Sequence, residues 1–265
     1  MPNPQSEMYS SPISNLQSHL AYHLLALADD ELILGHRQSE WCGHAPILEE
    51  DIAFANLALD ELGHAILWYQ LHAQLLGENP ETYPDQLVYF REPFEFRCAQ
   101  FVALPKGDWA FSMVRQYLFD ALETVRLEQY AQSTFTPLAE TAAKIRREEI
   151  YHLRHTAAWV KRLGLGTEES HRRMQNALDE LWPYTGQLFD PVPGEDALVE
   201  AGWLLDSHTL HTAWQAHVIP FLEAANLIIP TAKTRTLSRA LPSQHVVRIL
   251  ADLQQVARLD PQANW

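Results

Sequence analysis

The chain has 265 residues, 47% of them apolar, which allows one large domain or two small ones with a sizeable core. Nineteen Lys and Arg residues against 34 Asp and Glu residues give a net charge of −15, which disfavours binding to nucleic acid or to an anionic membrane surface. No apolar run reaches the roughly 18 residues of a membrane span, the N-terminus lacks the pattern of a signal peptide, and two cysteines exclude a disulfide framework. We therefore expect a soluble, cytoplasmic protein.

Residues 1–14 are polar and contain proline, so we expect them to form a loose arm. From Asn15 the leucines recur at spacings of three, four and seven, which predicts a first helix. A second helix of about 30 residues is expected between Pro46 and Gly77. Residues 78–108 contain four prolines and no sustained period, which indicates an extended connection.

The second half of the chain repeats this pattern. A third helix is expected from its N-cap Asp108 to about Thr134, and a fourth from about Pro137 to Gly164. Shorter helices are predicted further along, with turns between them, at 168–189, 207–225 and 242–256. The prediction is an all-α fold in which 15–265 form one domain, a bundle of four long helices with additional C-terminal helices.

Two long helices carry the motif Glu-x-x-His, at Glu61/His64 and at Glu149/His152. This spacing puts both side chains on one helix face, and di-metal carboxylate bundles use two such motifs together with one carboxylate from each of the other two helices. Composition alone gives roughly one such pair by chance, and we assign the third occurrence, at Glu168 beside a Gly-rich turn, to chance.

Two acids that precede the motifs strengthen the prediction of a metal site. Glu31 lies 30 residues before Glu61, and Asp120 lies 29 residues before Glu149, so antiparallel helix pairs bring each acid level with its motif. Both acids have apolar neighbours, and burying them is costly unless they are paired or bound to metal. The candidate metal ligands are therefore Glu31, Glu61, His64, Asp120, Glu149 and His152.

Other assignments remain open. Glu123 is a rival of Asp120 one turn along the same helix, and Glu148 is a rival of Glu149. Asp120 could instead form an ion pair with Arg115 or Arg126, as in a metal-free bundle whose carboxylates are held by arginines.

Two further features have simpler interpretations. The turn 40–46 combines a carboxylate, the Cys42 thiol and the His44 imidazole, and we interpret it as a packed corner with Trp41 in the core rather than as a nucleophile. Basic residues form a stripe along the fourth helix, which is typical of a solvated face, although it could meet a phosphate-bearing ligand or an acidic partner: Lys144, Arg146, Arg147, Arg154, Lys161 and Arg162.

The string Glu-Trp-Cys-Gly-His-Ala-Pro at 40–46 resembles the C subunit of bacterial phenylacetyl-CoA epoxidases. The segments Arg-Gln-Tyr at 115–117, Tyr-His-Leu-Arg at 151–154 and Leu-Phe-Asp at 188–190 fit the same protein in order and spacing, as does the tail that ends in Trp265. The resemblance implies a ferritin-like fold and a role in phenylacetate breakdown, within a multicomponent oxygenase. In that enzyme the homologous A subunit holds a di-iron centre and oxidises the ring of phenylacetyl-CoA, and the C subunit pairs with it as a structural component.

This chain departs from the family pattern because C subunits have lost most metal ligands, whereas all six positions here carry groups that can bind metal. We expect a di-iron centre, with manganese as an alternative, since carboxylates and imidazoles suit both ions. Glu61 and Glu149 would bridge or chelate, and each histidine would bind one ion. The expected partners are the homologous A subunit, together with other oxygenase components including a reductase, in a homo- or hetero-oligomer. The alternatives are a stand-alone ferritin-like di-metal oxidase and a metal-free structural subunit.

Overall fold

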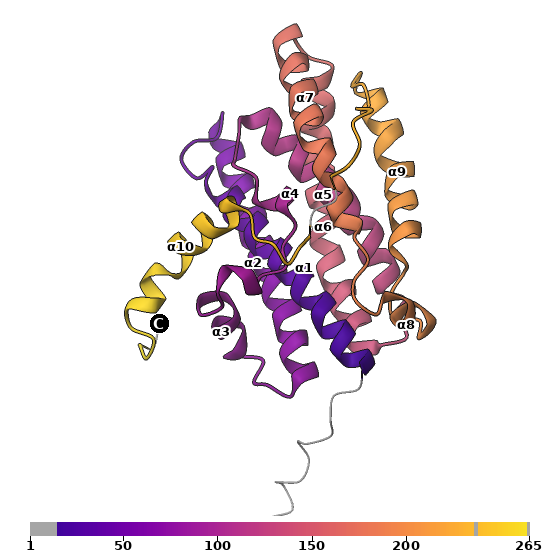
Figure 1. The fold of residues 1–265 in the computed structure, drawn as a ribbon. Helices are drawn as coiled ribbons and strands as arrows, with labels where there is room; N and C mark the ends of the chain where they lie inside the picture. The colour runs from indigo at the N-terminus through magenta and orange to yellow at the C-terminus, as the bar shows by residue number, and fades with distance from the viewer. Residues whose placement is uncertain (1–14, 236–237, 264–265) are drawn as a thin grey trace, which may run out of the picture.

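A computed structural model describes residues 15–235 and 238–263, which contain helices and no strand. Four long helices form the bundle, in an arrangement of the ferritin-like type (Figure 1): α1 (Asn15–Ser39), α2 (Leu48–Leu76), α5 (Trp109–Tyr130) and α6 (Thr136–Gly164). Helix α1 packs along α2 and α5 packs along α6, each pair joined by a short turn and therefore antiparallel. The all-α prediction is confirmed. The predicted arm at 1–14 and the final Trp265 lie outside the described residues.

Local sequence sets the ends of these helices. Three acids occupy the first turn of α2, where they interact favourably with the helix dipole, and the helix ends at Gly77 in the left-handed conformation (φ 75°). Asp108 caps α5 as predicted, because its side chain accepts a hydrogen bond from the Phe111 N–H. Helix α5 ends at Tyr130, about one turn before the predicted end near Thr134.

The connection at 78–108 is more ordered than the sequence predicts. It contains α3 (Tyr83–Tyr89), the 3₁₀ turn η1 (Pro93–Glu95) and α4 (Gln100–Ala103). Pro84 and Pro93 each stand in the first turn of one of these elements, where the missing N–H is not needed. These prolines prevent one long helix in this connection, and each of the two stands at the start of a short helical element.

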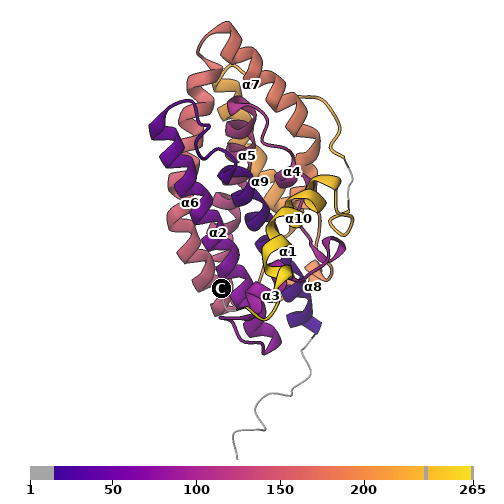
Figure 2. The same ribbon diagram turned by 90° about the vertical axis from the view of Figure 1, so that its left-hand side faces the viewer.

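The C-terminal elements surround the bundle (Figures 1 and 2): α7 (Glu168–Leu181), the 3₁₀ segment η2 (Trp182–Phe189), α8 (Glu195–Glu200), α9 (Ser207–Ala224) and α10 (Gln244–Leu259). The continuous helix predicted over 168–189 is wrong in its second half, since Pro183 lacks the N–H that an α-helix would use there. Helix α8 has six residues and is too short to give a periodic signal. Helices α7 and α9 pack on α5, whereas α10 packs near α1, α3 and α4.

At the corner between α1 and α2, Trp41 lies in the core as predicted, whereas the neighbouring His44 is exposed. The Trp41 indole N–H donates to Ser112 Oγ at 2.8 Å, and its ring lies edge-on to that of Trp109. Cys42 is exposed.

Among the described residues, no helix combines the length and the apolarity that crossing a membrane requires.

Candidate metal centre

The six predicted side chains meet inside the bundle, and none of them is more than 2% exposed. Helix α1 provides Glu31, α5 provides Asp120, and the two motifs come from α2 and α6. Two groups of three could each hold an ion, since their ligand atoms lie within 4.8 Å of one another: Glu31, Glu61 and His64, and Glu61, Asp120 and His152. Glu61 belongs to both groups.

The two motif glutamates lie between the two imidazoles. Glu61 Oε2 is 3.8 Å from His64 Nδ1, and Glu61 Oε1 is 3.7 Å from His152 Nδ1. Glu149 Oε1 is 3.3 Å from His64 Nδ1 and 3.1 Å from His152 Nδ1. Each carboxylate therefore reaches both halves of the centre, which is the placement that a bridging ligand needs.

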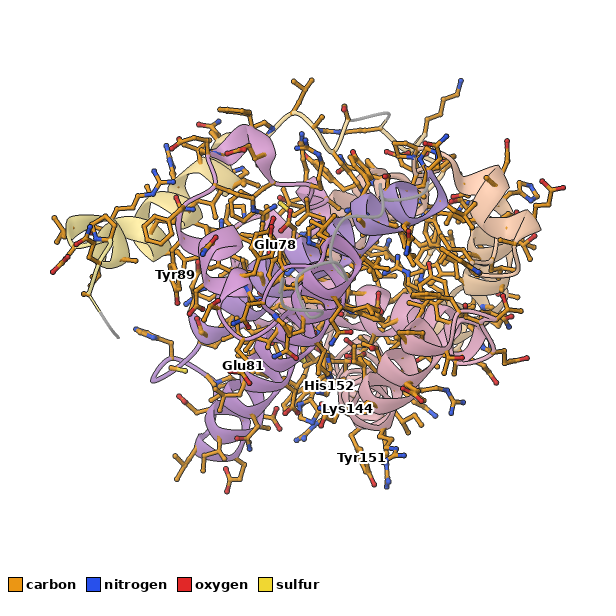
Figure 3. All side chains as sticks on the ribbon, turned by 90° about the horizontal axis from the view of Figure 1, so that it is seen from below. Glu78, Glu81, Tyr89, Lys144, Tyr151 and His152 are labelled. Atoms are coloured by element: carbon orange, nitrogen blue, oxygen red, sulfur yellow. The ribbon has the colours of Figure 1, made fainter. Side chains whose placement is uncertain are left out.

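Hydrogen bonds fix the orientation of both imidazoles. His64 Nε2 lies 2.8 Å from Glu148 Oε2, and His152 Nε2 lies 3.2 Å from Asp60 Oδ2. Each outer nitrogen therefore bonds the acid that immediately precedes the motif glutamate on the opposite helix, and each Nδ1 faces the centre. Carboxylates of this kind orient metal-binding histidines and raise their basicity. Figure 3 shows His152 toward α2 and its neighbour Tyr151 pointing away from the molecule.

Several buried atoms of the centre have no hydrogen-bond partner: Glu31 Oε2, Glu61 Oε2, His64 Nδ1 and Glu149 Oε2. A buried polar atom without a partner is costly, so such atoms are normally satisfied. Three carboxylate oxygens and one imidazole nitrogen in one place form a donor set that suits a divalent cation such as iron or manganese. The residues present therefore fit a metal ion.

The charges at the centre also fit a bound metal ion. Burial opposes the charge of both imidazoles, but the neighbouring carboxylates outweigh it and raise the pKa of His64 to about 10 and that of His152 to about 12. Burial raises the pKa of Glu31 and of Asp120 well above their usual range, and nearby carboxylates add to the shift. Without metal the centre therefore balances its excess negative charge by holding protons, which cations would displace.

The rival residues on α5 are engaged elsewhere. Glu123 forms an ion pair with Arg126, and Arg115 donates to the carbonyl of Leu104 at 2.6 Å. Among the described residues no arginine pairs with Asp120, which instead accepts from Gln116 Nε2 and from Thr156 Oγ1, both at 2.6 Å. These contacts favour Asp120 over Glu123 as a ligand.

Glu148 lies on the outer side of His64 with about half of its side chain exposed, so it orients the His64 ring and is not placed as a candidate ligand itself. The third motif lies away from the centre, where His171 Nδ1 bonds the Gly164 carbonyl oxygen at 2.9 Å. Four residues around the centre were not predicted from the sequence. Two are Asp60 and Thr156, and the other two are the glutamines Gln38 and Gln116, whose amides donate to Glu61. An acid directly before each Glu-x-x-His was the available signal for Asp60.

Comparison with known proteins places the chain in a family. A family model described as phenylacetic acid catabolic protein matches residues 7–265. The chain is 36% identical over 250 residues to the C subunit of 1,2-phenylacetyl-CoA epoxidase from Escherichia coli strain K12, with 94% of this chain and 100% of that protein aligned. It is 24% identical over 164 residues to the A subunit of the same enzyme, with 62% of this chain and 52% of that protein aligned. The chain therefore belongs to the phenylacetic acid catabolic protein family.

Proposed function

We propose that this chain is a C-type subunit of a phenylacetyl-CoA epoxidase that works in phenylacetate breakdown and pairs with a homologous A subunit. The observation that carries this proposal is the 36% identity to the whole of an epoxidase C subunit. The weaker likeness to an A subunit supports pairing between two related bundles. Further oxygenase components, including a reductase, complete the proposed assembly.

The proposal includes a di-iron centre, in which manganese is the alternative metal. Glu61 and Glu149 would bridge or chelate the ions, His64 and His152 would each hold one ion, and Glu31 and Asp120 would complete the two halves. The partnerless buried oxygens support this assignment. A bound iron pair supplies redox chemistry with dioxygen. The chain itself supplies the orientation of the imidazoles, through Asp60 and Glu148, and a bundle interior that excludes water from the ligands.

The outer face of α2 supports a helical partner. Ile52, Leu59 and Ile66 recur every seven residues along this face, and all are exposed, Leu59 to 65%. A seven-residue apolar repeat is the pattern that packs against a second helix. Gly63 lies on the same face, and a Cβ built there would meet nothing within 4 Å, which leaves room for the close approach of another backbone. We assign this face to a helix of the A subunit.

Elemental mass spectrometry tests the metal centre. Protein purified from iron-supplied cells is expected to hold close to two iron or manganese ions per chain, and Glu61→Ala to lose them. Glu168→Ala, which changes the third motif, is the matched control and is expected to keep the metal. Correctly folded wild-type protein without metal would refute the centre and leave a metal-free structural subunit.

Co-expression with an A subunit tests the assembly. The two chains are expected to purify as one complex, and epoxidation of phenylacetyl-CoA by that complex is expected to require this chain. Leu59→Glu should weaken the complex, whereas Ile228→Ser, at an exposed apolar residue outside α2, should not. A chain that oxidises substrates alone and forms no complex would instead be a stand-alone di-metal oxidase.

A further inference from the structure

The two halves of the centre differ in whether their buried atoms already have partners. On the His64 side, Glu31 Oε2 and Glu61 Oε2 have none, and the contact of His64 Nδ1 with Glu149 Oε1, at 3.3 Å, is not a hydrogen bond. On the other side, His152 Nδ1 contacts Glu149 Oε1 at 3.1 Å. Both oxygens of Asp120 and the Oε1 atom of Glu61 also accept hydrogen bonds there. The cost of unpaired buried polar groups is therefore concentrated in one half.

A single amide causes most of this difference. Gln116 Nε2 donates to Glu61 Oε1 at 2.7 Å and to Asp120 Oδ1 at 2.6 Å, so both of its N–H groups point at carboxylate oxygens. Gln38 holds this amide in place, because its Nε2 donates to Gln116 Oε1 and also lies 3.2 Å from Glu61 Oε1. Both glutamines are buried.

We propose that Gln116 makes the two ion sites unequal, so that one ion binds tightly at the His64 half and a second binds weakly at the His152 half. This inference rests on the proposed metal centre. A cation at the His64 half meets two carboxylate oxygens that accept no hydrogen bond, Glu31 Oε2 and Glu61 Oε2. A cation at the His152 half must first displace two amide N–H groups from the oxygens that would bind it, and these bonds to acidic groups are strong.

This inequality changes what the chain can do. One ion held at the His64 half leaves the shared Glu61 bridging an ion and an amide instead of two ions. The ligand set would then be complete in residue type, while the chain would hold two ions when metal is plentiful and one when it is scarce. Gln116 therefore controls how many ions the centre holds.

Titration with Mn²⁺ under chelator-free conditions tests the proposal, with calorimetry for affinity and electron paramagnetic resonance for isolated against coupled ions. The wild-type chain is expected to bind one Mn²⁺ tightly with the signal of an isolated ion, and a second at least about tenfold more weakly, a gap of about 1.4 kcal/mol. Gln116→Leu removes both donors at similar size and is expected to strengthen the second site at least about tenfold, so that a coupled signal develops at two ions per chain.

Two further variants complete the test. Gln254→Leu is the matched control, since Gln254 is also buried but donates to the carbonyls of Val88 and Arg91 away from the centre, and it should change neither affinity. If Gln116→Leu fails to fold, Gln38→Leu frees the Gln116 amide and should also strengthen the second site. Equal wild-type affinities, or a second site that neither variant changes, would overturn this inference alone. Absence of Mn²⁺ binding in every form would overturn the proposed centre with it.

Discussion

Two buried acids on α1, Asp29 and Glu31, are expected to respond in opposite directions when each is changed to its amide. They lie two residues apart and are equally inaccessible to solvent. Asp29 accepts hydrogen bonds from Tyr69 Oη, from the Arg91 guanidinium and from the backbone N–H of Arg97. Glu31 Oε2 has no partner and faces other carboxylates.

Asp29→Asn should destabilise the protein strongly. It removes the anion beside Arg91, whose guanidinium is buried 3.9 Å from the centre of the Phe96 ring. Breaking a buried ion pair by removing one partner costs about 3–5 kcal/mol. For a chain of this length that corresponds to a fall in melting temperature of about 6–20 °C.

Glu31→Gln should stabilise the metal-free protein. Burial, and then the charge of Glu61, raise the pKa of Glu31 well above its ordinary value of 4.5, so the folded state disfavours the ionised form of this acid. A carboxyl group whose pKa is raised in the folded state lowers the free energy of unfolding. This cost to stability is absent below the ordinary pKa and grows by about 1.4 kcal/mol per pH unit above it, until the pH reaches the folded-state pKa. The amide carries no charge into the core, so we expect a gain of about 1–3 kcal/mol at pH 7, or about 2–12 °C.

Thermal denaturation followed by circular dichroism, with a chelator present, measures both effects. The gain from Glu31→Gln should shrink as the pH is lowered toward 4.5, the ordinary pKa of a glutamate. If both variants destabilised the protein equally, the distinction would be wrong between Asp29, whose charge is paired with Arg91, and Glu31, whose charge would be paired with a bound cation.

Three further outcomes are expected. Asp120→Asn should weaken Mn²⁺ binding at the His152 half at least about tenfold. Glu123→Gln should change this affinity by no more than about twofold, because the Glu123 carboxylate is already held by Arg126. The Mn²⁺ titration measures both affinities. Burial and then the Arg126 charge lower the pKa of His23 to about 3, so its contribution to stability is present above pH 6.5 and lost as the pH falls toward 3. When the pH is lowered from 6.5 to 5, the free energy of unfolding of His23→Gln, measured by urea denaturation, should therefore fall by about 2 kcal/mol less than that of the wild type. An identical pH dependence would contradict this. Gly63→Ala should raise the stability of the isolated chain by about 1 kcal/mol, because glycine is a poor residue inside a helix, and should weaken binding to the A subunit; unchanged binding would remove α2 from the interface.

The register of the centre was predictable because it depends on helix length. Antiparallel helices of similar length bring residues about 30 apart to one level. Glu31 therefore meets Glu61, and Asp120 lies near enough to Glu149 for the Glu149 charge to raise its pKa. The hydrogen bonds around the ligands were harder to predict. Gln116 contacts Glu61 across the bundle, 55 residues away, and a lone glutamine in a helix has no spacing that distinguishes it from a surface residue.

The short elements between the long helices escaped prediction for a related reason. Helices such as α3, α4 and α8 have four to seven residues, fewer than two turns, so they show no apolar period. Their positions depend on tertiary contacts. Asp29 and Asp30 on α1 accept from the backbone N–H groups of Arg97 and Ala99, and thereby hold the connection against the bundle.

The distribution of buried acids separates structural from functional charge. Asp29 pairs with Arg91, Asp30 with Arg239 and Glu123 with Arg126, each away from the centre. The four acids at the centre form no ion pair with Arg or Lys among the described residues, although Arg115 lies buried on α5 and donates only to backbone carbonyls. A bundle held together for strength alone would be as stable or more stable with apolar residues in place of these acids. The absence of guanidinium groups where the negative charge is most concentrated therefore favours a bound cation over the metal-free structural alternative.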